Sequence, residues 1–180
     1  QEFGPAAFIS RARKEGARDF GACMSPHTAF LILQGIETLN LRMKRHVENT
    51  NEIVNFLDQH ELVTNVSYPS LRSHKDHQLA KDLLPKGCGA VFTFEIKGGK
   101  IAGQTFIENL NIFSHLANVG DAKSLVIHPA STTHHRMDKE ALAKAGISES
   151  TIRLSVGLED SNDLIDDLEM GLSAVKKLKD

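Results

Sequence analysis

The 180-residue sequence has no tryptophan and only one tyrosine, so it offers few aromatic rings on which nucleic-acid bases could stack. Its formal net charge of −2 provides no positive field that would attract nucleic acid or an anionic lipid surface. No apolar run approaches the roughly 20 residues needed to span a bilayer, and the N-terminus does not resemble a secretory signal. We therefore expect neither a nucleic acid nor a membrane as a partner.

Cysteine is also scarce. Cys23 and Cys88 are the only two, and they lie far apart in the sequence. They form no disulfide framework, which is typical of a protein in the reducing cytoplasm, and we expect that location.

Histidine is frequent, with nine residues, so a metal site has to be considered. His128, His134 and His135 fall within eight residues, and His74 and His77 have the i, i+3 spacing of one helix face. Zinc sites combine such histidines with cysteine or carboxylate ligands in a recognisable arrangement, and none is present. We expect no metal site, and we expect His74 and His77 to be surface residues.

Other catalytic motifs are missing as well. There is no G-x-S-x-G turn of the kind that holds a nucleophilic serine. The glycines of 87–89 and 98–99 do not open a helix with the spacing of a phosphate-binding loop, and they predict turns. The acidic run Glu159, Asp160, Asp163, Asp166 and Asp167 predicts helix capping and a solvated helix face.

The overall composition, with 41% hydrophobic and 24% charged residues, is that of a globular protein rather than a disordered one. A chain of this length can bury one real core, and a second full domain is not expected. We found no internal repeat, low-complexity tract or linker in the sequence.

A long helical pattern follows a short helix expected near residues 5–14. Ser25 followed by Pro26 is a strong helix start, and apolar residues then recur at helical spacing to about His60. Two interpretations are open: two helices with a break near Asn49–Asn51, or one long helix that connects this domain to a region upstream.

The rest of the chain alternates between strands and helices. We predict strands at 62–68, 90–97, 124–127 and 151–157, an extended segment at 111–116, and helices at 74–84, 102–110, 138–145 and from about 160 to the C-terminus. Several links are too short for parallel crossovers. The predicted fold class is therefore α+β, a mostly antiparallel sheet with helices packed on one face.

One arginine stands out on the last predicted strand, in the sequence TIRLSVG. Ile152, Leu154 and Val156 share one face of the strand, which places Arg153 on the other. A guanidinium held on a strand and away from the core can bind a carboxylate through two parallel charge-assisted hydrogen bonds.

The surrounding sequence resembles a known family. HLANVGDAKSLVIHPASTTH (115–134) and IRLSVGLED (152–160) are similar to the C-terminal part of O-acetylhomoserine sulfhydrylases, which are pyridoxal-phosphate (PLP) enzymes of the cystathionine gamma-synthase (Cys/Met metabolism) family. The likeness continues in FGPAAF (3–8), LQGIETLNLRMKRHVENT (33–50) and LPKGCGAVFTFEIKGG (84–99). The order and spacing of these runs make the match specific.

The resemblance implies a particular place for this chain within a larger enzyme. Residues 61–180 would be the small C-terminal domain of a fold-type I PLP-dependent transferase. Residues 1–60 would be the end of the large-domain region and a long interdomain helix. This reading favours the uninterrupted helix.

The resemblance also assigns substrate-binding residues. Arg153 matches the arginine that pairs with the α-carboxylate of the amino-acid substrate. Asn118 and the backbone N–H of Val119 match the groups that assist it, and Thr133 matches a hydroxyl of the same network. Where this chain has Asn118, the lyase and gamma-synthase branches tend to have serine, which favours the sulfhydrylase branch.

The catalytic half of such a site is not found in the sequence. The lysine that binds PLP, the phosphate-binding backbone and the aspartate facing the pyridine nitrogen are expected upstream, in a large cofactor domain that mainly holds PLP. No lysine of the chain sits in the family's lysine motif, so we assign no catalytic residue here and expect this chain alone to be inactive.

The implied activity of the full-length protein is the conversion of O-acetylhomoserine and sulfide to homocysteine and acetate, in methionine and cysteine biosynthesis. The implied assembly is a cytoplasmic homotetramer. Cystathionine gamma-synthase and methionine gamma-lyase are alternatives within the family. Outside it, the alternatives are a stand-alone, non-catalytic module that binds a small carboxylate, and a protein-interaction domain with Arg153 on an open, flat surface.

Overall fold

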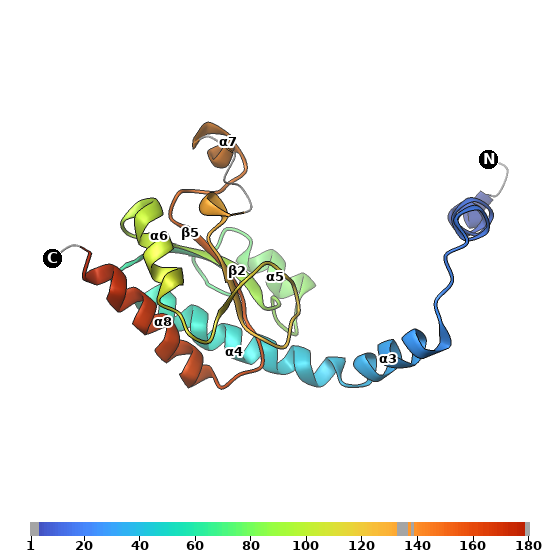
Figure 1. Cartoon of the computed structure of the whole chain (residues 1–180), viewed down its shortest axis with the longest axis horizontal. Helices are drawn as coiled ribbons and strands as arrows, with labels where there is room; N and C mark the ends of the chain where they lie inside the picture. Colours follow the sequence, from blue (N-terminus) through green and yellow to red (C-terminus); the bar gives the residue numbers. More distant parts are fainter. Residues whose placement is uncertain (1–3, 133–136, 138, 179–180) are drawn as a thin grey trace. The chain divides into compact units, whose positions relative to one another are not determined.

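The computed structural model of the chain describes residues 4–132, 137 and 139–178 (Figure 1). Its contacts divide it into two units, Gln1–Asn40 and Leu41–Asp180. No helix in the described part of the chain is both long enough and apolar enough to cross a membrane.

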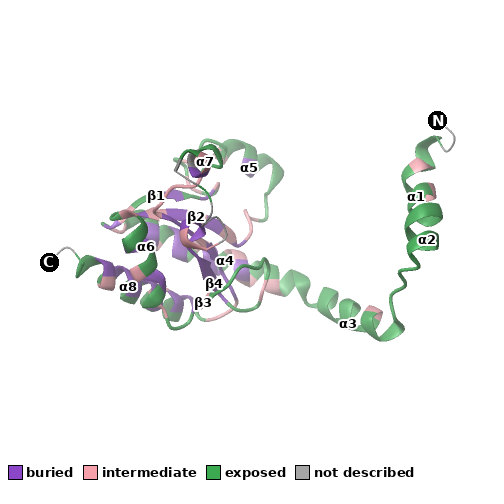
Figure 2. Cartoon of the chain, turned by 45° about the horizontal axis from the view of Figure 1, so that its top comes forward, coloured by how far each residue is buried: buried purple, intermediate pink, exposed green. Residues whose placement is uncertain are grey.

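The first unit is helical and has no core of its own. A continuous helical run comprises η1 (Gly4–Ala6), α1 (Ala7–Arg11), the π-helical η2 (Ala12–Ala17) and α2 (Arg18–Phe20), and α3 follows at Pro26–Glu37. The predicted start of α3 is confirmed, because Ser25 Oγ accepts the Thr28 N–H at 3.1 Å and Pro26 takes the first position. No described residue of these elements is buried (Figure 2).

Helix α4 (Leu39–Gln59) follows α3 after the single residue Thr38 and runs without interruption through Asn49–Asn51. The predicted break near Asn49–Asn51 is therefore wrong. The single uninterrupted helix from Pro26 to about His60 is also wrong, because the helix is interrupted at Thr38. The buried face of α4 carries apolar and polar residues together: His46, Asn49, Thr50, Ile53, Val54 and Leu57. This face belongs to the second unit, so α4 packs with the residues that follow it in the chain. The predicted interdomain role of residues 1–60 stays a prediction.

The second unit contains a five-stranded sheet in the order β1-β2-β5-β4-β3. The strands are β1 (Val63–Ser67), β2 (Val91–Ile96), β3 (Ser114–His115), β4 (Leu125–Ile127) and β5 (Thr151–Ser155). The β1–β2, β2–β5 and β4–β5 pairs are antiparallel, and only β3–β4 is parallel. The expected mostly antiparallel sheet is confirmed.

The remaining helices are α5 (His77–Leu83), α6 (Gly99–Glu108), α7 (Lys139–Lys144) and α8 (Ser161–Lys176), with a 3₁₀ turn η3 at Pro129–Ser131. Figure 1 shows α4 and α8 on the same side of the sheet. Their apolar stripes and that of α6 meet alternate residues of β2 and β5 in one core, among them Phe94, Phe106, Ile152, Leu154 and Leu168, none of which is exposed. Burial of this apolar surface is the main force that holds the helices to one face.

The acidic run at 159–167 differs from its prediction at two positions. Asp160 caps α8 as expected, and hydrogen bonds from Asn162 lower the pKa of its carboxyl. Asp167, however, is only 3% exposed, and it accepts the backbone N–H groups of residues 111–113 at 2.7–3.2 Å. Glu159 is also half-buried and bonded to Ser124. Neither carboxylate lies on a solvated face. Each accepts hydrogen bonds from backbone N–H groups that would otherwise be buried without partners.

We expect the chain to self-associate through the apolar side chains of α3. Phe30 is 57% exposed and Leu33 59%, and neighbouring apolar side chains extend this surface. The variant Phe30→Glu/Leu33→Glu should lower the average mass measured by light scattering at high protein concentration, because buried carboxylates would oppose association. Ile101→Glu, which changes a 69% exposed residue on α6, is the matched control and should leave the mass unchanged. A wild-type chain that stays monomeric at every concentration would contradict this expectation.

Candidate carboxylate-binding site

The middle of β5 presents Arg153 on the sheet face opposite the main core. Ile152 and Leu154 are fully buried in that core, whereas Arg153 is half-buried. One neighbour across the sheet is Thr93 on β2, and the other is Ile127 on β4. The predicted alternation along β5 is therefore confirmed, and it follows from the two-residue period of a strand.

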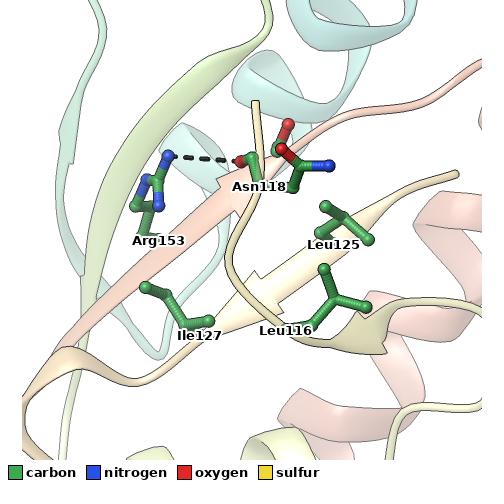
Figure 3. Close-up of a pocket in the computed structure, with 6 residues that line it drawn as sticks. Leu116, Asn118, Leu125, Ile127 and Arg153 are labelled. Carbon is green, nitrogen blue, oxygen red and sulfur yellow. Dashed lines mark hydrogen bonds between the residues drawn. The ribbon is translucent and has the colours of Figure 1, made fainter. Parts of the chain in front are cut away.

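Arg153 borders a small hollow next to a loop that follows β3 (Figure 3). Its Nη2 donates to the Asn118 backbone carbonyl at 3.4 Å, which is a long hydrogen bond. No carboxylate of the described residues lies within ion-pair distance of Arg153. The guanidinium keeps most of its donors available for an anion, and its expected position near Asn118 is confirmed.

The floor of this hollow is apolar. Leu125 and Ile127 of β4 are only 2% and 6% exposed, and they lie opposite Ser155 and Arg153 in the sheet register. Leu116 and Asn118 complete the lining. A charge beside such a low-dielectric surface interacts more strongly with an opposite charge than it would in open water.

The sequence pattern did not single out Ser155, although it lies two residues beyond Arg153 on the same strand face. Ser155 is 4% exposed, and its hydroxyl has no hydrogen-bond partner among the described residues. The alternation that places Arg153 also predicts that Ser155 shares its face, but it gives no sign that the hydroxyl is buried.

The loop that contains Asn118 and Val119 is organised by its own side chains. The Val119 N–H donates to Asn118 Oδ1 at 2.9 Å, and Asn118 Nδ2 donates to Asp121 at 3.4 Å. Asp121 also accepts the Lys123 N–H at 3.0 Å. Both groups assigned to the carboxylate therefore bond within the loop, and rotation of the Asn118 side chain would release the Val119 N–H. Their proposed role in binding stays a prediction.

Thr133 lies outside the described residues, but the residues just before it are well fixed. His128, which has no exposed surface, bonds through Nδ1 to Ser131 Oγ and through Nε2 to the Glu149 carbonyl, each at 2.8 Å. Because the carbonyl can only accept, Nε2 carries the proton and Nδ1 accepts from Ser131 when the ring is neutral. Burial lowers the pKa of His128, and the charges of Lys100 and His115 lower it further. This histidine is a neutral anchor for the turn that leads to Thr133.

The described residues do not fit covalent attachment of a cofactor or a metal centre. Every lysine whose side chain burial is described is exposed, so none sits in the covered surroundings that would protect a lysine-bound carbonyl group. Within the same part of the chain, no three His, Cys, Asp or Glu side chains are grouped to hold a metal ion. His74 and His77 are half-buried and bond to nearby backbone groups. Among the described residues, Arg153 therefore remains a candidate for binding an anion, and its role stays a prediction.

Comparison with known proteins decides the family. The model of the Cys/Met metabolism PLP-dependent enzyme family matches residues 6–173. The chain belongs to this family.

Several relatives within the family are similar along nearly the whole chain. An O-acetyl-L-homoserine sulfhydrylase of Thermus thermophilus is 46% identical over 173 residues, which are 96% of this chain and 41% of the relative. The corresponding enzyme of Leptospira meyeri is 47% identical over 170 residues, covering 94% of this chain and 38% of the relative. The chain thus spans about 40% of the length of the curated relatives it matches.

Solved structures support the same family assignment. An O-acetylhomoserine (thiol)-lyase of Campylobacter jejuni, whose structure holds a pyridoxyl-lysine phosphate, superposes with a TM-score of 0.86 at 40% identity and covers 96% of this chain and 41% of its own. A cystathionine gamma synthase of Xanthomonas oryzae in complex with cystathionine has a TM-score of 0.81 at 42% identity, over 89% and 41% of the two chains. The family resemblance inferred from the sequence is confirmed, and the family's cofactor is PLP.

Protonation of His128 should make the free energy of unfolding of the protein depend on pH. Its folded-state pKa lies below the ordinary value of 6.5, so the unfolded chain binds the proton first and the folded state loses stability as pH falls below that value. We expect the free energy of unfolding of the wild type to decrease, relative to His128→Gln, between about pH 7 and about pH 5. Urea unfolding of both proteins at the two pH values measures this difference. Parallel pH dependence in the two proteins would show that His128 is not the group involved.

Proposed function

We propose that this chain is the C-terminal part of a PLP-dependent O-acetylhomoserine sulfhydrylase and that it binds the substrate α-carboxylate. In this proposal residues 61–180 are the small domain of a fold-type I enzyme. Residues 1–60 are the end of the large-domain region and the helix that joins the two. The parent protein, a cytoplasmic homotetramer, converts O-acetylhomoserine and sulfide to homocysteine and acetate.

The observation that carries this proposal is the position of Arg153. The guanidinium lies beside an apolar hollow, off the core face, with no carboxylate partner among the described residues. A substrate carboxylate placed there would accept two parallel hydrogen bonds from the planar fork. The Val119 N–H, the Asn118 amide and the Thr133 hydroxyl are the further donors assigned to it.

The chain's contribution to the reaction is positioning. Binding the carboxylate at a fixed point on a rigid strand sets the direction of the substrate Cα–H bond, and binding energy is thereby converted to orientation. PLP, when bound in the full-length enzyme, supplies the electron sink for chemistry at that carbon. The exposure of the described lysines supports the expectation that the cofactor lysine belongs to another part of the protein.

The sulfhydrylase branch is preferred to the gamma-synthase and lyase branches because of Asn118. Its Oδ1 accepts the Val119 N–H at 2.9 Å while its Nδ2 donates to Asp121 at 3.4 Å, so the amide uses two different atoms. A serine has a single oxygen on a shorter side chain in place of these two atoms. Assay of the full-length protein with sulfide and with cysteine as alternative sulfur donors separates the branches: homocysteine formed from sulfide supports this proposal, and cystathionine formed preferentially from cysteine contradicts it.

In the full-length protein, Arg153→Ala should lower kcat/KM by roughly 10²-fold or more, because each charge-assisted hydrogen bond contributes about 1.5–3 kcal/mol. Arg153→Lys should also lower it, though less, since lysine keeps the charge and loses the planar fork. Steady-state kinetics with O-acetylhomoserine measure both effects, and cofactor absorbance checks that the fold is intact. Arg72→Ala removes an exposed arginine elsewhere in the second unit and should leave kcat/KM unchanged. Full activity of Arg153→Ala would refute the assignment.

The isolated chain, residues 1–180, should form no defined covalent adduct with PLP. We expect incubation with PLP, borohydride reduction and peptide mass spectrometry to find only low, scattered labelling of lysines, because those described are solvent-exposed. Stoichiometric labelling of a single lysine would overturn the view that this chain lacks the cofactor's attachment site.

A further inference from the structure

The connection between β5 and α8 is bonded to the end of the loop that carries Asn118. Glu159 Oε1 accepts the Ser124 N–H at 2.8 Å, and Glu159 Oε2 accepts the Ser124 hydroxyl at 2.9 Å. The Ser124 hydroxyl oxygen in turn accepts the Gly157 N–H at 2.8 Å. Ser124 has no exposed surface and Glu159 is half-buried, so these bonds are partly shielded from water.

The backbone approaches so closely here that residue 157 has to be glycine. A Cβ atom at Gly157 would lie 2.5 Å from both the Ala122 carbonyl oxygen and the Ser124 nitrogen. The Leu158 N–H also donates to the Ala122 carbonyl at 2.9 Å. Ala122 and Ser124, at the end of the loop, are thus both fixed against the segment that leaves β5.

Ser124 is joined to the assigned carboxylate donors through a short series of contacts. Lys123, its neighbour, bonds to Asp121, and Asp121 bonds to Asn118. On the other side of the loop, Ser114 of β3 donates to the Ser124 carbonyl at 3.0 Å. The loop that faces Arg153 therefore has both of its ends attached near Ser124.

We propose that Glu159 is a positioning residue for the carboxylate site: by holding Ser124, it fixes the distance between the Asn118–Val119 segment and Arg153. This inference rests on the proposed function in one respect, that the anion bound between these groups is the substrate carboxylate. Glu159 itself does not touch the substrate.

The proton arrangement explains why a carboxylate is needed at position 159. The Ser124 hydroxyl oxygen already accepts from Gly157, so its own proton requires an acceptor, which Glu159 Oε2 provides. In Glu159→Gln, the amide can adopt two orientations. With its N–H₂ group in the position of Oε2, a donor faces the Ser124 hydroxyl, whose proton has no acceptor. With its N–H₂ group in the position of Oε1, the Ser124 N–H loses its acceptor. Either orientation breaks one buried hydrogen bond while the side chain keeps its size.

In the full-length protein, Glu159→Gln should raise KM for O-acetylhomoserine roughly tenfold, because the carboxylate donors lose their fixed spacing, and the less precise orientation should lower kcat by a smaller factor. Ser124→Ala should have a similar effect, and the double variant should be little worse than either single one, since both remove the same link. Val175→Ala, which destabilises the core at the far end of α8, should leave KM unchanged.

A second measurement on the 180-residue chain does not depend on activity. In Glu159→Gln, the backbone amide NMR signals of Val119 and Lys123 and the Arg153 side-chain Nε–H signal should shift, whereas Val175→Ala should leave them in place. Unshifted signals would overturn the proposal, and so would shifted signals with an unchanged KM.

The kinetics separate this inference from the proposed function. If Arg153→Ala keeps full activity, the proposed function fails. If Arg153→Ala loses activity as expected but Glu159→Gln has an unchanged KM, only the role of Glu159 is contradicted.

Discussion

The packing of the second unit depends on the hydrogen bonds made by the backbone just after β5. Val156, Gly157 and Glu159 carry backbone carbonyls that the sheet no longer pairs, and buried carbonyls need partners. His46 and Asn49 of α4 provide them. His46 Nδ1 bonds to the Val156 carbonyl at 2.7 Å, and Asn49 Nδ2 bonds to the carbonyls of Gly157 and Glu159 at 3.1 and 2.9 Å. Together with Ser124, these contacts join α4, β4, β5 and α8 at one point. The position of Arg153 on β5 is fixed by the same junction.

This junction also explains which parts of the fold the sequence could predict. Alternating apolar residues place β2 and β5 correctly, and the Leu164–Leu168–Leu172 stripe predicts the buried face of α8. The sequence did not indicate that the polar residues His46 and Asn49 are buried, and it left open a helix break near Asn49–Asn51. Their partners lie 108–110 residues further along the chain, so no local pattern could reveal that these residues are buried. Asp167 was closer to being predictable, because it lies three residues after Leu164 on the buried side of α8.

The candidate site, like the fold, could be predicted only in part from the sequence. Strand alternation was enough to place Arg153 off the core face, and the family resemblance implied that it lies near Asn118. It could not show that the loop uses its own Asn118 and Asp121 side chains to bond its backbone, because such bonds depend on the loop's conformation. Nor could it show that Ser155 is buried with a hydroxyl that has no hydrogen-bond partner among the described residues. The segment over Ser155 comes from residues 116–118, about 40 residues earlier in the chain, and its arrival depends on the parallel pairing of β3 with β4.

The two units require different explanations for their stability. Residues 41–180 close a core around β2 and β5, whereas α3 leaves Phe30, Ile32 and Leu33 between 45% and 59% exposed. A twelve-residue helix in water is marginal by its own hydrogen bonds, so an apolar helix of this length needs other protein surface to persist. In the proposed enzyme, that surface comes from the remaining part of the protein, or from another copy of it. The same dependence applies to the proposed chemistry: the groups that would act on the carbon next to a carboxylate bound at Arg153 also have to come from outside residues 41–180.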